Sequence, residues 1–189
     1  MAKVSLNPIL ERFRGKIGDL VFKRFLNRTI VGRRPDSSGN EPSIAQNAVR
    51  TRFRLAANYA RGVFADPVLK AAYAAVAKVR GLPTFALALT DYLKPPVVNT
   101  VDLAGYNGHV GDLVAIEAVD DFEVVGVTVV VRNDGGDVLE QGPATLVNGR
   151  WQYAATVPIG AGETLTVEAT ATDRPGHTGT KSVLVVLQP

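Results

Sequence analysis

The fold is decided by the stretch Leu165-Thr166-Val167-Glu168-Ala169-Thr170-Ala171, in which apolar and polar side chains alternate throughout. Successive side chains of a β-strand point to opposite faces of a sheet, so a two-residue period predicts a half-buried strand. Two further stretches share this period. Their alternating positions are Val125, Val127, Val129 and Val131 in one, and Trp151, Tyr153, Ala155 and Val157 in the other.

Turn signals separate these strands along the second half of the chain. Gly, Asn, Asp and Pro favour turns, and about seven alternating runs between such turns are typical of an immunoglobulin-like sandwich. We therefore predict an all-β immunoglobulin-like sandwich over residues 97–189. The turn signals are Asn107-Gly108, Asp134-Gly135-Gly136, Asn148-Gly149, Gly160-Ala161-Gly162 and Pro175-Gly176.

Upstream of the sandwich, the apolar residues recur at helical spacing. A first helix is expected directly after Ser43, which forms a capping box with Gln46. The stripe expected to be buried consists of Ala45, Ala48, Val49, Phe53, Ala56, Ala57, Ala60 and Phe64. The other side of this helix carries Asn47, Arg50, Arg54, Asn58 and Arg61, which makes it an amphipathic helix with a basic face.

Two more helices are expected before the sandwich begins. Asp66-Pro67 supplies an N-cap followed by proline at the first helical position, and Gly81 suits a C-terminal cap. A shorter helix opens at Pro83-Thr84 and ends at Pro95-Pro96, because proline cannot continue the hydrogen-bond ladder.

A β-hairpin is predicted nearer the N-terminus, with strands over residues 17–23 and 29–31 and a turn at residues 26–28. A turn-rich linker over residues 33–42 follows it. An isolated hairpin is only marginally stable in water. We therefore expect this one to pack against the helices, the sandwich or a neighbouring molecule.

Charge divides the chain at the same place as the change in period. Residues 1–96 carry 17 Lys and Arg against 6 Asp and Glu, whereas residues 97–189 carry 4 against 12. We predict two domains, a basic α+β domain over residues 1–96, made of the hairpin and about three helices, and the acidic sandwich over residues 97–189. Opposite fields of this kind steer association with a polyanion or with another copy of the chain.

Two resemblances accompany these patterns. The run from Trp151 to Tyr153 and the run from Val167 to Gly179 resemble the end of bacterial immunoglobulin-like domains, with His177 where an Asn is usual. The first half is similar to an uncharacterised bacterial family, through Gly15-Lys16-Ile17-Gly18, Arg34-Pro35, Ala45-Gln46 and Arg50-Thr51-Arg52-Phe53. The first resemblance implies a fold, and neither implies an activity. Immunoglobulin-like modules of this kind do resemble parts of phage particles or secreted assemblies.

No catalytic pattern accompanies the fold. The chain has no Cys and only two His, His109 and His177, so a zinc site would be poorly supplied. We predict no enzymatic activity, no cofactor and no small-molecule substrate. Calcium binding at the Asp-rich sandwich loops stays open, although the pattern of a twelve-residue calcium loop is missing.

No secretory signal peptide or apolar run of membrane-spanning length is found. Localisation is therefore open, with an extracellular filament or a virion reached by a non-classical route as the expectation.

Two groups of residues are the candidates for self-association or anion binding. The first is basic and combines the hairpin with one helix face: Arg24, Arg28, Arg33, Arg34, Arg50, Arg54 and Arg61. The second is on the last strand, which is apolar on both faces and should be covered by something: Val183, Val185 and Leu187.

These patterns favour a structural subunit that binds other copies of itself head to tail, forming a homo-polymer such as a filament or a particle. A nucleic-acid-binding protein is the first alternative, because clustered arginines can neutralise phosphates. Against it, Phe53 and Phe64 are expected in the buried stripe and not as stacking platforms. A phage virion component, or an adhesin-like module that binds through loops such as residues 105–112, is a further alternative.

Overall fold

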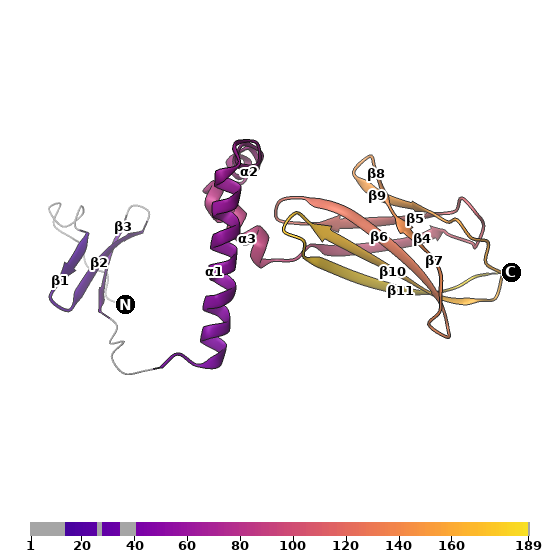
Figure 1. Cartoon of the computed structure of the whole chain (residues 1–189), viewed down its shortest axis with the longest axis horizontal. Coiled ribbons are helices and arrows are strands. Elements are labelled where there is room, and N and C mark those ends of the chain that lie inside the picture. The colour runs from indigo at the N-terminus through magenta and orange to yellow at the C-terminus, as the bar shows by residue number, and fades with distance from the viewer. Residues whose placement is uncertain (1–13, 26–27, 35–40, 189) are drawn as a thin grey trace. The chain divides into compact units, whose positions relative to one another are not determined.

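The computed structural model describes residues 14–25, 28–34 and 41–188. The chain forms two compact units, Met1–Ser43 and Ile44–Pro189. Figure 1 shows the order of the elements, from a small sheet through three helices to a β-sandwich. Among the described residues, no helix is both long and apolar enough to cross a membrane.

The first unit contains a three-stranded antiparallel sheet in the order β1 (Gly15–Ile17), β2 (Leu20–Phe25) and β3 (Arg28–Arg33). The expected single strand over residues 17–23 is wrong, because the chain reverses at Gly18. Its φ of 56° lies in the left-handed region, which glycine adopts without steric cost. The expected turn at residues 26–28 lies partly outside the described residues, since only Arg28 is described there, as the first residue of β3.

One face of this small sheet carries apolar side chains together with Arg33, which pairs with Leu20. Ile17 pairs with Leu20, and Phe22 pairs with Val31, and partners directly opposite each other in an antiparallel pair share a face. Ile17 is 54% exposed, Leu20 43% and Val31 42%. Three short strands therefore bury little of their own apolar surface.

The helices follow as α1 (Ile44–Ala65), α2 (Pro67–Arg80) and α3 (Thr84–Leu93). The ends of α2 lie at the capping residues predicted from the sequence. Asp66 caps α2, because its Oδ1 accepts the backbone N–H groups of Val68 and Leu69 at 2.9 and 3.1 Å. Gly81 ends α2 in the left-handed conformation, with φ of 65°. The core that joins the three helices consists of Ala60, Val63, Tyr73, Ala77, Leu87 and Ala88.

The predicted sandwich is confirmed, with eight strands in two antiparallel sheets where about seven were expected (Figure 1). One sheet has the order β11-β10-β6-β7 and the other the order β4-β5-β9-β8. These orders correspond to the two sheets of an immunoglobulin-like domain, with β7 added beside β6. The strands are β4 (Val97–Gly105), β5 (Leu113–Val119), β6 (Val124–Asn133), β7 (Val138–Pro143), β8 (Thr145–Val147), β9 (Arg150–Ala154), β10 (Thr164–Asp173) and β11 (Thr178–Val186).

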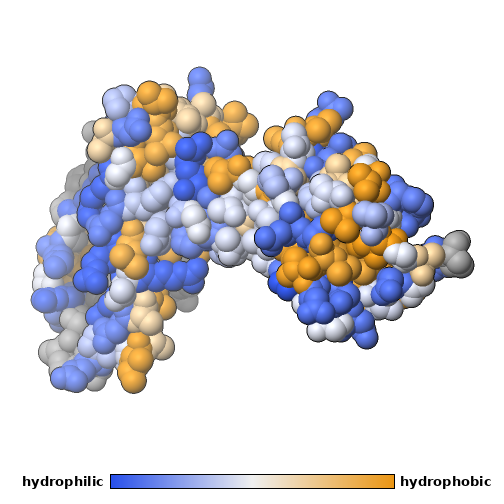
Figure 2. Space-filling view, turned by 45° about the vertical axis from the view of Figure 1, so that its right-hand side comes forward, coloured by the Kyte–Doolittle hydropathy of each residue, from blue (hydrophilic) through white to orange (hydrophobic). Residues whose placement is uncertain are grey.

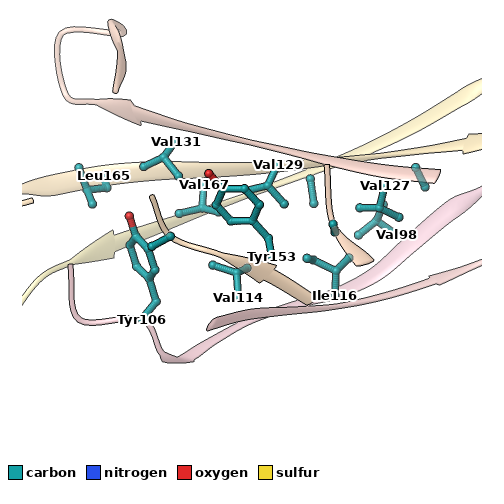
Figure 3. Close-up of a cluster of buried hydrophobic side chains, with 14 of the residues drawn as sticks. Val98, Tyr106, Val114, Ile116, Val127, Val129, Val131, Tyr153, Leu165 and Val167 are labelled. Carbon is teal, nitrogen blue, oxygen red and sulfur yellow. The ribbon is translucent and has the colours of Figure 1, made fainter. Parts of the chain in front are cut away.

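The alternation along β10 sets the sandwich core. Leu165, Val167, Ala169 and Ala171 are fully buried, while the Thr and Glu residues between them are not. Figure 3 shows side chains of the two sheets meeting between the layers, including Val114 and Ile116 from one and Val129 and Val131 from the other. Burial of this apolar surface is the main source of stability of the sandwich.

A buried carboxylate completes the core. Glu140 of β7 is 5% exposed, and it accepts hydrogen bonds from the hydroxyl groups of Tyr106 (3.3 Å) and Tyr153 (2.9 Å). Its Oε2 also accepts the Thr156 hydroxyl (2.9 Å) and the backbone N–H groups of Thr156 (2.7 Å) and Val157 (3.3 Å). Burial, together with this carboxylate, raises the pKa of Tyr106. The charge is therefore matched by converging donors.

The helices and the sandwich lie in one compact unit. The rings of Tyr73 on α2 and Phe122 in the β5–β6 loop stack with centroids 3.7 Å apart. Lys94 pairs with Asp121 of the same loop at 3.0 Å. Only residues 94–96 separate α3 from β4, and Pro96 is fully buried. The expected boundary at residue 96 thus divides helices from strands, and as a boundary between separate domains it stays a prediction.

Candidate interaction surface

The basic face of α1 is fully open to solvent. Arg50, Arg54 and Arg61 recur at spacings of four and seven residues, which places them on one side of the helix, and all three are exposed. Arg61 donates to Asn58 Oδ1 at 2.8 Å. Within the described part of the chain, no acidic side chain pairs with Arg50 or Arg54. Their charge is therefore available to an anionic partner.

Apolar side chains accompany these arginines, contrary to expectation. Only Ala56, Ala60 and Val63 of α1 are buried, and Phe53 is 53% exposed and Val49 69% exposed. Phe64 is 39% exposed and lies edge-on to Phe85. The predicted buried stripe is thus wrong over its first half. Figure 2 shows exposed apolar side chains scattered among hydrophilic ones.

A groove of about 620 Å³ runs along another side of the same helix. It is open to solvent, and its lining includes Tyr92 of α3 and His177 of the sandwich, whose rings meet edge-on with centroids 4.8 Å apart. Arg52 is held in it by a 2.5 Å hydrogen bond to the carbonyl of Leu93. Sequence reasoning missed this groove because its walls lie far apart in the chain. They are formed by Ile44, Asn47, Ala48, Thr51, Arg52, Leu55, Tyr92 and His177.

Acidic side chains gather at the end of the sandwich that is remote from the helices. Asp134 and Asp137 are exposed in the β6–β7 turn, and Glu163 is exposed just before β10. Pairing of Leu165 with Asn133 brings these segments together. Arg132, which bonds the carbonyl of Gly136, is the one described cation beside this turn. We call Asp134, Asp137 and Glu163 the acidic end.

Other acidic residues of the sandwich are engaged inside the molecule. Glu140 and Asp173 are buried. Asp121 binds Lys94, and Glu123 binds Arg174 at 2.6 Å. The charge excess of the sandwich is therefore less uniform than its composition indicates, and the acidic end holds a large part of what remains exposed.

The last strand presents a different side from the one selected from the sequence. Val183 and Val185 are half-buried and Leu187 is 2% exposed, with Val185 and Leu187 packed on the sandwich core. The outward side chains are Leu184, 67% exposed, and Val186, 48% exposed. Their own sandwich thus covers Val185 and Leu187, and a role of Val183, Val185 and Leu187 in self-association stays a prediction.

The remaining basic candidates lie in the first unit. Arg33 ends β3, and Arg33 and Arg34 are exposed. Arg24 lies in β2 and Arg28 begins β3, and their side chains are outside the described part of the structure. A role of these four residues in self-association or anion binding stays a prediction.

The described acidic and histidine side chains do not form a metal site. No cluster of three or more side chains able to ligate a metal occurs among the residues with described positions. In the loop considered for ligand binding, Asp112 Oδ2 accepts the backbone N–H groups of Asn107 and His109 at 2.7 and 2.9 Å. These bonds, that of His109 first, lower the pKa of Asp112. This carboxylate therefore stabilises the loop.

No protein-family model and no curated protein matches the chain. Among solved structures, an engineered protein shows 26% identity over 48% of this chain and 20% of its own, with a TM-score of 0.34. A tetra-tandem repeat of a large adhesion protein shows 23% identity over 50% of this chain and 24% of its own, also at 0.34. A conjugative transposon lipoprotein from Bacteroides eggerthii shows 16% identity over 48% and 93%, at 0.25. The chain spans about a fifth and a quarter of the first two, and none of the three is named as an enzyme.

Proposed function

We propose that this protein is a non-enzymatic structural subunit that assembles head to tail, with the basic face of α1 in one copy binding the acidic end of the sandwich in the next. The observation that carries the proposal is the separation of the two surfaces. Strand β6 runs from the loop that contacts the helices to the acidic end, and its ten residues span about 33 Å at 3.3 Å per residue. Opposite charges thus lie at opposite ends of one compact unit.

A contact between two different surfaces is heterologous, so it can repeat from copy to copy. It closes into a ring or continues as a filament, depending on the rotation between neighbours. We propose a filament as the first product and a particle, such as a component of a phage virion, as the second. Both are homo-polymers, and neither needs a catalytic site.

Charge alone does not supply the affinity. An exposed ion pair contributes about 0 to 1 kcal/mol, whereas a micromolar Kd corresponds to about 8 kcal/mol. Val49 and Phe53, exposed beside Arg50 and Arg54, add apolar area that can be buried in the contact. In this proposal the arginines orient the two copies and the apolar side chains supply much of the binding energy. Salt should therefore weaken assembly without abolishing it at once.

A charge-swap experiment tests the proposal. The R50E/R54E variant and the D134R/D137R variant should each stay monomeric in sedimentation velocity at low salt, while the wild type forms larger species. Mixing the two variants should restore assembly, because each then offers the charge that the other lacks. Arg150, exposed at the start of β9, provides the matched control R150E, which should assemble normally. A wild type that is monomeric at low salt, or a mixture that stays monomeric, would refute head-to-tail binding.

Nucleic-acid binding is the second candidate, and the exposure of Phe53 favours it. An aromatic ring beside arginines provides a platform on which an unpaired base can stack. A gel shift with single-stranded DNA across a salt series separates the two functions, because phosphate contacts weaken steeply with ionic strength. Binding that is lost in both F53A and R50E/R54E would favour this candidate over assembly.

A further inference from the structure

Two carboxyl groups meet where the helices contact the sandwich. Asp91 of α3 is fully buried, and its Oδ2 accepts the Tyr73 hydroxyl at 2.5 Å. Tyr73 is in turn bonded to the Tyr59 hydroxyl at 2.8 Å. Asp120 follows β5, and its Oδ2 accepts the backbone N–H groups of Phe122 (2.9 Å) and Glu123 (3.2 Å). One oxygen of each carboxyl group is thus fixed by donors of its own.

The other oxygen of each group has no donor. Asp91 Oδ1 and Asp120 Oδ1 are both buried without a hydrogen-bond partner among the described residues. The two groups are neighbours, because Tyr73, which binds Asp91, stacks at 3.7 Å on Phe122, whose N–H binds Asp120. Two ionised carboxylates are acceptors only, so they cannot bond without a proton. A single proton between them would satisfy both oxygens.

We propose that Asp91 and Asp120 share one proton, and that this proton fastens the helices to the sandwich and makes their junction sensitive to pH. The proposal is independent of head-to-tail assembly. It concerns a proton-binding site inside one copy, formed by α3 and the loop that follows β5.

The cations near this junction are engaged elsewhere, which is why a proton is needed. Lys94 and Arg80 both bind Asp121, at 3.0 and 3.5 Å, and Arg80 also approaches the carbonyl of Asp120. No described Lys, Arg or His side chain forms an ion pair with Asp91 or Asp120. Burial of an unpaired charge is costly, and a buried carboxyl group avoids it by retaining its proton.

The remaining charged groups near this junction either favour the protonated form of Asp91 or are paired with each other. Asp173 is buried on the sandwich side, and its negative charge favours a protonated Asp91. It accepts the backbone N–H of His177 at 2.6 Å and lies 3.2 Å from the His177 ring nitrogen. Arg174 binds Glu123. Burial first, and the neighbouring Asp120 and Asp173 in addition, raise the pKa of Asp91 to about 7, although the Tyr73 hydroxyl acts in the opposite direction.

The direction of the pH effect follows from this raised pKa. The folded unit holds the proton more tightly than the unfolded chain, so folding is favoured at low pH. Stability is lost as the pH rises from the ordinary aspartate range through about 7. At higher pH two charged carboxylates face each other at this junction, and their repulsion should loosen α3 from the loop that follows β5.

The variant D91N tests the proposal, because asparagine imitates the protonated acid. Its amide can donate to Asp120 at every pH, while its oxygen still accepts from Tyr73. The unfolding equilibrium constant of the wild type should increase about a hundredfold between pH 5 and pH 8, whereas that of D91N should be nearly constant. Glu117, exposed on β5 and outside both proposed contact surfaces, gives the control E117Q, which should follow the wild type.

If D91N folds poorly, a second measurement on the wild type alone still tests the proposal. Amide exchange at Phe122 and Glu123 in the wild type, corrected for the intrinsic effect of pH, should accelerate above pH 7. A wild type whose unfolding constant and exchange protection do not change over this range would overturn the shared proton. So would a D91N variant with the wild-type pH dependence, because the titrating group would then lie elsewhere. Sedimentation of the wild type at constant pH decides head-to-tail assembly separately.

Discussion

Replacing Glu140 by leucine should destabilise the sandwich by about 4 kcal/mol. The change keeps side-chain volume but removes the acceptor of five hydrogen bonds. The hydroxyl of Thr156 can turn to water, since that residue is exposed. The buried hydroxyls of Tyr106 and Tyr153 and the part-buried backbone N–H groups of Thr156 and Val157 are left. Each unsatisfied buried group costs about 1 to 3 kcal/mol. At about 1 kcal/mol for each of these four groups, the expected loss is about 4 kcal/mol.

Glutamine at the same position should cost much less, about 1 to 2 kcal/mol, because only the charge is lost. Its oxygen can replace Oε2, which accepts four of the five bonds, and its amide can donate to the hydroxyl of Tyr106. Stability should therefore increase from the leucine variant to the glutamine variant to the wild type. The first difference measures the loss of hydrogen-bond acceptors and the second the loss of the charge.

Denaturant unfolding, followed by the fluorescence of the single tryptophan, Trp151, measures these differences. Trp151 is half-buried on β9 and packs on the sandwich core. The neighbouring Gln141 is exposed, so Q141L should stay within about 0.5 kcal/mol of the wild type. A leucine variant at position 140 that loses less than about 1 kcal/mol would refute the reasoning, because the network would then contribute nothing beyond packing.

Three further outcomes are expected. Alanine at Gly179 should lower the unfolding midpoint strongly, because its Cβ would clash with the backbone carbonyl of Pro96, whereas alanine at Gly126, with open space around it, should not. Asp66→Ala should cost about 0.5 to 2 kcal/mol in the same assay, since it removes the cap of α2. The pKa of Asp112 is lowered, so its bond to the N–H of His109 should persist until the pH falls below the ordinary aspartate range, and amide exchange over a pH series measures this.

Much of the fold follows from local pattern. A two-residue period fixes which side of β10 is buried, and Ser43, Asp66 and Gly81 mark helix ends, because these signals act over a few residues. The first strand was mispredicted at Gly18, where a run of strand-forming residues conceals a tight turn. Local signals of this kind therefore give element type more securely than element boundaries.

The candidate surface was only partly accessible to sequence reasoning. The basic face of α1 follows from helical spacing. The exposure of Phe53 does not, because periodicity shows which side of a helix is apolar and not how far a neighbouring helix extends along it. The meeting of Asp91 with Asp120 depends on two segments that come together only in the folded chain. Net charge likewise gave no sign that Glu140 and Asp173 are buried.

The short connection between α3 and β4 has a mechanical consequence. Two consecutive prolines restrict rotation of the backbone there, and Pro96 is clamped inside the structure. Tension applied to the helices would thus be transmitted directly to β4, because no flexible linker lies between α3 and this strand. In a polymer built from such subunits, we expect bending to occur at the contacts between copies, and the elasticity of the whole to depend on how tightly those contacts hold.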